Sequence, residues 1–266
     1  MRWRSLLRPR ERAFIELRRL AEIRARRDLE RVPDLWRLLQ EYLQRTESTG
    51  CGLIDYHTLY THVRATAPVE ILECGTGAST VVLAAALREN EREGRPRGRV
   101  TSMEDHENWY EMARRLLPDE LHDYVDLVLS PGEDGAFSLF RGRRYREVPE
   151  RPYGFVFVDG PSYRTDDGFM TFDLDVLDVI SRSEQKVSAV VDARVSTCWV
   201  LQQVLGTEKV RFDPARRLGF VAPSTSADMR LVRDDTPSRS FQGSWRLGGT
   251  TRLAFTRDAE LGRWKR

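Results

Sequence analysis

The chain has 266 residues, of which 40% are hydrophobic and 32% are charged, and its formal net charge is +2. This length fits one α/β domain with an appendage, and no apolar stretch approaches the roughly 20 residues needed to span a bilayer. Cys51, Cys74 and Cys198 are too few and too scattered for a disulfide framework or a zinc cluster. The N-terminus lacks the apolar core of a secretory signal, so we expect a cytoplasmic protein.

The first part of the chain is strongly basic. Residues 1–27 contain ten arginines and three glutamates, a net charge of +7, whereas the remainder has 33 basic and 38 acidic residues, a net charge of −5. Apolar residues recur there at steps of three and four, which predicts two helices separated by Pro33. We therefore expect a basic helical arm over residues 1–50, followed by the main domain over residues 51–266.

Several roles fit this arm. The simplest is a solvated helix that packs locally. It could also cover the substrate cleft or a subunit interface, and we expect the protein to be a homo-oligomer. Contact with an anionic membrane through Trp3, Leu6 and Leu7 is a further option. Nucleic acid is not expected as a partner, because the basic stretch lacks interleaved aromatic residues and the rest of the chain is acidic.

The most informative segment is residues 69–80, V-E-I-L-E-C-G-T-G-A-S-T. A short apolar run ends at Glu73, Gly75 and Gly77 follow, and a helical pattern begins directly afterwards. This order predicts a strand, a tight turn and a helix, so that a nucleotide-like ligand can approach backbone N–H groups. Thr80 replaces the third glycine of a dinucleotide-binding loop. The acid before the first glycine instead suits a ligand with positive charge near the turn.

A second strand, predicted over residues 99–103, ends at Glu104 and Asp105. An acid in this position accepts hydrogen bonds from ribose hydroxyls in nucleotide-binding α/β folds. It lies about thirty residues after the glycine turn, against the usual spacing of about twenty. The polar insert over residues 89–98, which we interpret as a surface loop, explains the excess. A helix is predicted over residues 107–117.

The remaining pattern continues the alternation of strands and helices. Further strands are predicted over residues 125–129, 153–158 and 186–191, further helices over 57–64, 169–181 and 196–204, and short C-terminal strands over 209–212, 218–222 and 251–256. The apolar strands are typical of parallel strands covered on both faces. The predicted fold is α/β: a doubly wound, mainly parallel seven-stranded sheet with a C-terminal antiparallel hairpin and an N-terminal helical arm.

Chemistry is expected where these strands end. Asp159 follows the fourth strand, and Asp192 and Arg194 follow the fifth. The two carboxylates would lie at neighbouring strand ends, where they could hold a cation or remove a proton from an acceptor hydroxyl. The arginine could hold a carboxylate or phosphate of the acceptor. We take Asp159, Asp192 and Arg194 as the candidate catalytic residues.

The motif E-x-G-x-G at Glu73–Gly77 resembles motif I of the class I S-adenosylmethionine-dependent methyltransferases, and S-M-E-D-H-E-N-W-Y resembles the second motif of small-molecule O-methyltransferases. The resemblance covers roughly residues 55–204. It implies that Glu73 lies near the methionine amine, that Glu104 holds the ribose and that Glu133 and Asp134 lie where the adenine amine is contacted. The donor-binding residues that it implies are Glu73, Gly75, Thr76, Gly77, Ser79, Thr80, Glu104, Asp105, Glu133 and Asp159.

The resemblance also bears on metal binding. Metal-dependent catechol-type O-methyltransferases carry an aspartate after strand four and an aspartate–asparagine pair after strand five. This chain has Asp159 and Asp192, but Ala193 replaces the asparagine, and its four histidines show no metal-ligand spacing. The two aspartates could still hold Mg²⁺ or Ca²⁺, but a divalent metal is not expected.

The resulting prediction is an enzyme that transfers a methyl group from S-adenosylmethionine to a hydroxyl of a small molecule or sugar. N-methylation is the alternative within enzymes. Two alternatives lie outside this class: a nicotinamide-dependent oxidoreductase, and a non-catalytic Rossmann-like scaffold in a glycan-assembly complex. The missing third glycine disfavours the oxidoreductase, and the intact Glu73 and Glu104 disfavour the scaffold.

Overall fold

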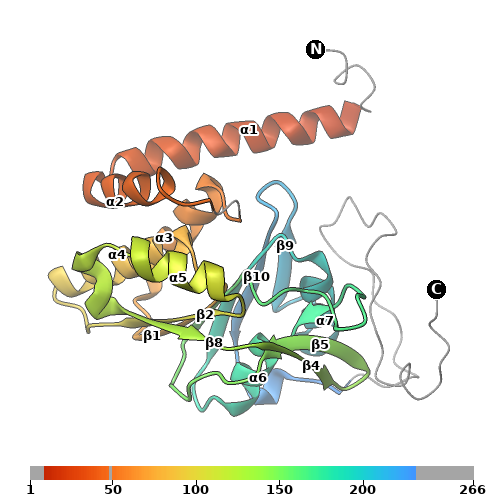
Figure 1. Ribbon diagram of the computed structural model, residues 1–266. Coiled ribbons are helices and arrows are strands. Elements are labelled where there is room, and N and C mark those ends of the chain that lie inside the picture. The colour runs from red at the N-terminus through yellow and green to blue at the C-terminus, as the bar shows by residue number, and fades with distance from the viewer. Residues whose placement is uncertain (1–8, 48–49, 232–266) are drawn as a thin grey trace.

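The computed structural model describes residues 9–47 and 50–231, with side chains from residue 15 onward (Figure 1). Its helices are α1 (Pro9–Glu30), α2 (Pro33–Leu43), α3 (Leu53–Thr66), α4 (Ala78–Arg92), α5 (Glu107–Leu116), η2 (Asp119–Tyr124), α6 (Asp175–Arg182), α7 (Val195–Leu205) and η3 (Ser226–Asp228). Its strands are β1 (Glu70–Cys74), β2 (Arg99–Glu104), β3 (Val125–Leu129), β4 (Gly132–Phe137), β5 (Phe140–Tyr145), β6 (Phe155–Val158), β7 (Phe172–Asp173), β8 (Val187–Asp192), β9 (Val210–Asp213) and β10 (Leu218–Ser224).

Seven of these strands form one sheet in the order β3-β2-β1-β6-β8-β10-β9. The first five are parallel, while β10 runs antiparallel to both β8 and β9. This confirms the predicted α/β fold with its terminal antiparallel hairpin. The chain moves from β1 to β2 on one side and later enters β6 on the other. The turn after β1 therefore lies at the point where the strand order reverses, which is where open α/β sheets bind ligands.

The sheet is covered on both faces, because each strand directs alternate side chains to opposite sides. Ile71, Val100, Phe155 and Val190 pack with buried residues of α1 to α4. On the opposite face, strand residues pack with α6, α7 and the small sheet β4-β5-β7. The two layers of helices give the three-layer arrangement seen in Figure 1.

The N-terminal helices belong partly to this core. Leu29 of α1 and Leu35, Leu38 and Leu39 of α2 are fully buried and lie in the same apolar cluster as α3 and α4. Pro33 begins α2, as the sequence predicts. The N-terminal half of α1 extends away from the body of the molecule (Figure 1). The predicted arm is thus anchored by its second half.

Two segments differ from the sequence-based expectation. The helix predicted over residues 169–181 begins only at Asp175, because the aromatic Phe172 pairs as a strand with Gly142 of β5. Residues 132–145, for which no strand was predicted, form the β4–β5 hairpin. Opposite charges face each other across it, since Asp134 pairs with Arg143 and Glu133 with Arg144.

The insert at residues 89–98 is only partly a loop. Helix α4 continues to Arg92, and the buried Asn90 donates a hydrogen bond to the carbonyl of Val63. The short strand predicted over residues 251–256 and the membrane-facing Trp3, Leu6 and Leu7 lie outside the described residues. Within the described part of the chain, no helix has both the length and the apolar character required to cross a membrane.

Candidate active site

Four carboxylates gather at the carboxyl ends of the central strands. Glu73, Glu104 and Asp192 stand in or at the end of β1, β2 and β8, and Asp159 directly follows β6. In each strand the preceding residue packs on the α6–α7 face. Strand alternation therefore directs all four carboxylates to the face covered by α3 and α4. The sequence-predicted acids are brought to one region by the parallel sheet.

The glycine turn lies directly against the end of β6. Gly75 has a φ of +97°, a conformation that favours glycine. A Cβ at this position would lie 2.9 Å from the carbonyl carbon of Asp159 and 3.0 Å from the nitrogen of Gly160. Gly77 then precedes α4, and its N–H donates to the hydroxyl of Thr80 at 3.0 Å. The turn is thus fixed between the ends of β1 and β6 by close backbone contact.

Glu73 is fully buried beneath this turn. Its Oε2 accepts hydrogen bonds from the hydroxyls of Thr80 and Ser102, both at 2.6 Å. Its Oε1 is buried and has no hydrogen-bond partner among the described residues. Burial raises the pKa of Glu73 to about 7, although the nearby hydroxyl groups of Ser102, Ser79 and Thr80 oppose this shift. One oxygen of a buried carboxyl group is therefore available to a donor from a ligand.

Glu104 organises the neighbouring loop. Its Oε1 accepts from the N–H groups of Asp105 and His106 at 3.1 and 3.0 Å, and its Oε2 lies 3.4 Å from the N–H of Thr76. Burial raises its pKa to about 7. Asp105 Oδ2 accepts from the N–H of Ser162 at 3.4 Å, which links the end of β2 to the loop after β6. The structure therefore places Glu73, Glu104 and Asp105 around the glycine turn.

Asp159 and Asp192 form a close pair beside Cys51. The Cys51 thiol donates to Asp159 Oδ2 at 3.5 Å, and the two aspartates are hydrogen-bonded to each other. Burial and, after it, the charges of Asp159 and Asp55 together raise the pKa of Asp192 to about 8. Two neighbouring carboxylates cannot readily both ionise, so the pair holds one proton, and Asp192 carries it.

Arg194 lies behind this pair and binds groups of the chain itself. Its Nη1 donates to Asp173 Oδ1 at 2.5 Å and to the carbonyl of Pro161 at 2.7 Å, and its Nη2 donates to the carbonyl of Asp159. Its Nη2 also lies 3.7 Å from Asp159 Oδ1. The fully buried Asp173 is held in turn by Thr197 at 2.6 Å. The guanidinium therefore supports the turn after β6. The sequence had suggested instead that it would hold a carboxylate or phosphate of the acceptor.

Residues 72–180 match a family described as a methyltransferase domain. That stretch includes the glycine turn, Glu104 and Asp159. No curated protein matches the chain closely enough to be counted as a relative.

Solved methyltransferases resemble the chain in structure. The O-methyltransferase TomG of Streptomyces achromogenes, solved with S-adenosylmethionine, is 20% identical with a TM-score of 0.40, and the match covers 59% of this chain and 64% of TomG. A methyltransferase-like protein of Silicibacter pomeroyi is 19% identical with a TM-score of 0.43, covering 68% of this chain and 88% of that one. An O-methyltransferase of Bacillus cereus, solved with S-adenosylhomocysteine, is 18% identical with a TM-score of 0.41, covering 68% and 74%.

The group of side chains at these strand ends offers a poor set of ligands for a hard divalent cation. Cys51 Sγ and carboxylate oxygens of Asp159 and Asp192 lie within 4.8 Å of one another, the one group of at least three such ligands within the described ranges. A thiol is a soft ligand, whereas Mg²⁺ and Ca²⁺ prefer oxygen. Ala193 supplies no ligand atom, and the guanidinium of Arg194 already lies beside Asp159. We therefore assign no chemical step to a metal.

Glu133 is not brought to the donor-binding group. Its carboxylate pairs with Arg144 at 3.1 Å and Arg146 at 3.4 Å. Its neighbour Gly132 faces Asp105 instead, so Glu133 points to the other side of the hairpin.

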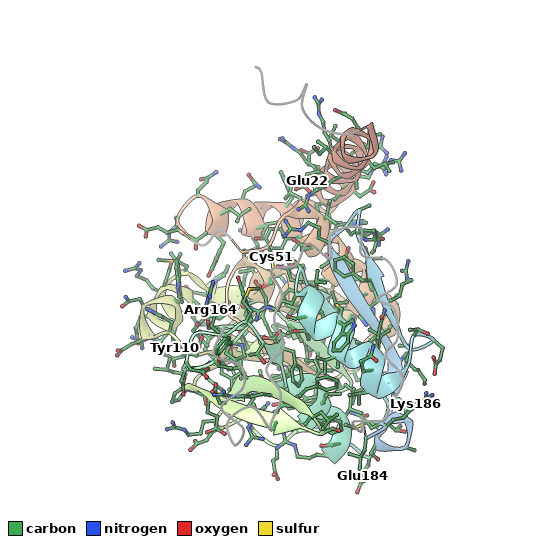
Figure 2. The ribbon with its side chains drawn as sticks, turned by 90° about the vertical axis from the view of Figure 1, so that its right-hand side faces the viewer. Glu22, Cys51, Tyr110, Arg164, Glu184 and Lys186 are labelled. Atoms are coloured by element: carbon green, nitrogen blue, oxygen red, sulfur yellow. The ribbon has the colours of Figure 1, made fainter. Side chains whose placement is uncertain are left out.

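Sequence reasoning missed the contribution of the segment before β1. Cys51 contacts Asp159, and Asp55 of α3 accepts from the N–H of Gly52 at 2.6 Å while its charge acts on Asp192. The N–H of Leu53 donates to Glu22 of α1 at 3.1 Å. Figure 2 shows Glu22 and Cys51 where α1 meets the body of the molecule. No motif marks these residues, and only the acid at the start of a predicted helix could have indicated Asp55.

Proposed function

We propose that this protein is a methyltransferase that transfers a methyl group from S-adenosylmethionine to a hydroxyl of a small molecule or sugar. The observation that carries the proposal is the glycine turn packed against Asp159, with the unpaired Oε1 of Glu73 below it and Glu104 beside it. Carboxyl groups on this side suit a ligand with an ammonium group, a sulfonium and ribose hydroxyls. A cytoplasmic location and a homo-oligomeric state belong to the same proposal and rest on the sequence.

The reaction requires alignment and the removal of one proton. The bound donor supplies an activated methyl group, whose bond to sulfur breaks as the acceptor oxygen forms its bond to carbon. Glu73 and Glu104 hold the two ends of the donor near the turn, while Asp159 contacts the acceptor hydroxyl and takes its proton. The products are the methyl ether, neutral S-adenosylhomocysteine and one further proton, on Asp159, added to the one that Asp192 already holds.

Calorimetry with S-adenosylhomocysteine tests the donor site. We expect binding in the micromolar range, roughly −8 kcal/mol. Glu104→Ala should weaken it by roughly 1–3 kcal/mol, because hydrogen bonds to a charged acceptor are lost. Tight NADH binding with no binding of S-adenosylhomocysteine would contradict the proposal and favour an oxidoreductase.

Metal dependence is tested separately. Because Ala193 offers no ligand and Arg194 already neutralises Asp159 in part, EDTA should leave most of the activity intact. Full loss of activity with EDTA and its restoration by Mg²⁺ would show that the pair recruits a further ligand.

N-methylation has one observation in its favour. Asp55, Asp159 and Asp192 act on one another electrostatically, and this excess of carboxyl groups also suits a cationic amine acceptor. A mass-shift screen of hydroxyl-bearing and amine-bearing acceptors with isotopically labelled donor distinguishes the two reactions.

A further inference from the structure

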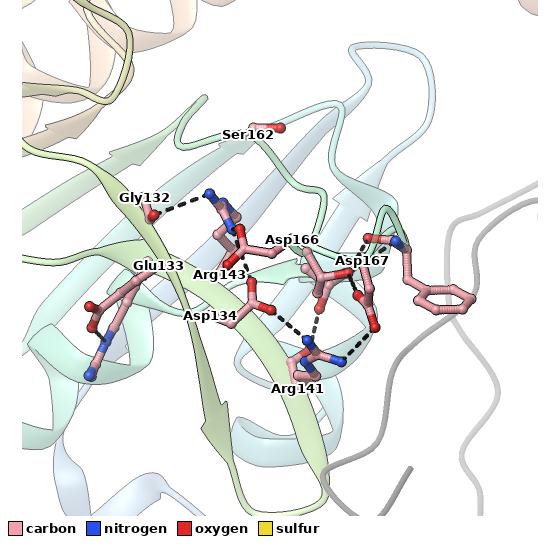
Figure 3. Close-up of polar contacts among 12 residues, drawn as sticks. Gly132, Glu133, Asp134, Arg141, Arg143, Ser162, Asp166 and Asp167 are labelled. Carbon is pink, nitrogen blue, oxygen red and sulfur yellow. Dashed lines mark hydrogen bonds and ion pairs between the residues drawn. The ribbon is translucent and has the colours of Figure 1, made fainter. Parts of the chain in front are cut away.

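The β4–β5 hairpin carries a partly buried arginine close to the donor site. The side chain of Arg143 is 13% exposed. Its Nη1 donates to Asp134 at 3.0 Å and to Asp166 at 2.7 Å, and its Nη2 donates to the carbonyl of Gly132 at 3.1 Å (Figure 3). Its Nε is buried and has no hydrogen-bond partner in the part of the chain that the structure describes. A buried donor without a partner is destabilising, and a ligand atom that accepts from it removes this cost.

Gly132 places this unpaired donor next to a carboxylate. A Cβ at Gly132 would lie 3.0 Å from Arg143 Nε and 3.2 Å from Asp105 Oδ2, so both atoms lie near the same point above the backbone. Glycine is the residue that lets the guanidinium lie flat against this strand. The Arg143 Nε–H and the Asp105 carboxylate therefore present one hydrogen-bond donor and one acceptor side by side.

The position of this pair relates it to the donor. Asp105 directly follows Glu104, which in the proposed function binds the ribose of the donor. The base of a nucleoside lies next to its ribose. Adenine carries a ring nitrogen that accepts a hydrogen bond adjacent to an exocyclic amino group that donates one. An N–H beside a carboxylate is the complement of that edge.

We propose that Arg143 is a donor-binding residue, whose Nε–H donates to a ring nitrogen of the adenine of S-adenosylmethionine while Asp105 accepts from the exocyclic amino group. This assignment rests on the proposed function. Asp134 and Asp166 hold the guanidinium in place and are positioning residues. Asp166 belongs to the loop after β6, whose Ser162 also binds Asp105, so the adenine end of the site is closed by both segments.

The hairpin provides a matched control. Arg141 binds the same Asp134, at 2.6 Å, and binds Asp167 at 3.0 Å in the way that Arg143 binds Asp166. No contact of Arg141 with Gly132 or Asp105 is found among the described residues. Arg141→Met thus removes a similar pair of ion contacts from the same hairpin without removing the proposed contact to adenine.

Calorimetry on the full chain tests the assignment with S-adenosylhomocysteine and its 1-deaza and 7-deaza analogues, which each lack one ring nitrogen. We expect Arg143→Met to weaken S-adenosylhomocysteine binding by roughly tenfold or more, and Arg141→Met to change it by no more than about twofold. One analogue should bind the unmodified protein roughly tenfold more weakly than S-adenosylhomocysteine. That penalty should disappear in Arg143→Met, because the partner of the missing nitrogen is gone.

Other results would overturn the assignment. Equal binding of S-adenosylhomocysteine and both analogues to the unmodified protein would show that no ring nitrogen is recognised. If Arg143→Met does not fold, this comparison on the unmodified protein is the test of the assignment. A penalty that persists in Arg143→Met assigns the nitrogen to another residue. Failure of the unmodified protein to bind S-adenosylhomocysteine at all would instead refute the proposed function, and the assignment would fall with it.

Discussion

Asp159 and Asp192 determine the acid–base properties of the site. They stand at the ends of neighbouring strands on the same face of the sheet, so the fold itself forces two carboxyl groups together. The guanidinium of Arg194 stabilises the ionised form of both groups, but burial outweighs it and raises the pKa of both, and at Asp192 the charge of Asp159 adds to the shift. The pair therefore holds one proton at neutral pH, and Asp159 is the member that can accept another.

This arrangement predicts a pH dependence of the reaction. Below about pH 8 Asp192 is protonated and donates to Asp159, which weakens Asp159 as a base. Turnover should therefore rise as Asp192 loses its proton near pH 8. Asp192→Asn should lack this rise, and Asp159→Asn should lose roughly a hundredfold or more in kcat while its affinity for S-adenosylhomocysteine stays the same. A pH–rate profile with labelled donor measures both effects; an Asp159→Asn variant with unchanged kcat would exclude this carboxylate as the base.

The same pKa shift predicts how stability varies with pH. An unfolded aspartate has a pKa of about 3.9, whereas folded Asp192 has a pKa of about 8. Between these values the folded state binds the additional proton, so this group's contribution to the free energy of unfolding is complete below about pH 4 and is lost as the pH rises to about 8. Asp192→Asn should remove the trend, so its melting temperature relative to the unmodified protein should increase from pH 5 to pH 8. A constant difference across that range would contradict the shifted pKa.

At the scale of elements, the sequence predicted the sheet well because parallel strands carry continuous apolar runs. β1, β2, β3, β6 and β8 each begin or end within two residues of the predicted limits. The carboxylates at their ends follow from strand alternation and could be placed without a structure. The positions of Glu73 and Glu104 at the ends of β1 and β2 could therefore be predicted from the sequence.

The β4–β5 hairpin was not predictable in the same way. Its strands contain Gly132, Gly135 and Gly142 and several charged residues, a composition typical of loops. It is formed by cross-strand ion pairs and by packing on α6, neither of which leaves a periodic signal. Arg143 was missed with it, and Glu133 was placed on the wrong side because alternation within an unrecognised strand could not be applied.

The turn after β1 can be tested against a second glycine. Gly75 and Gly94 both have positive φ, +97° and +80°. A Cβ at Gly94 would meet nothing within 4 Å, whereas a Cβ at Gly75 would meet the backbone of Asp159 and Gly160. Gly94→Ala should therefore cost only the conformational penalty, about 1–2 kcal/mol. Gly75→Ala should cost several kcal/mol or displace the turn, with loss of S-adenosylhomocysteine binding. Denaturant unfolding and calorimetry measure the two effects, and equal losses in both variants would show that the close approach is unimportant.

At the scale of the whole molecule, α1 joins two environments. Its second half is held by Ala25 and Leu29 in the core and by the hydrogen bond from Leu53 to Glu22. Earlier in the same helix, the residues Leu17, Leu20 and Ile23 are 57%, 50% and 55% exposed. Removing residues 1–30 would therefore take away part of the core together with these three exposed side chains. Substituting the three side chains alone tests their role without disturbing the core.

We expect that this stripe, defined by Leu17, Leu20 and Ile23, docks on a second copy of the chain. Residues 1–27 carry a net charge of +7 and the remainder −5, so the arm of one copy is attracted to the body of another. At physiological ionic strength this attraction reaches only about 8 Å, so apolar contact must supply the rest. Leu17→Ser, Leu20→Ser and Ile23→Ser together should lower the mass measured by light scattering while leaving S-adenosylhomocysteine binding unchanged. If the mass stays constant and the substitutions instead abolish co-sedimentation with anionic vesicles, the stripe binds membranes and not a second copy.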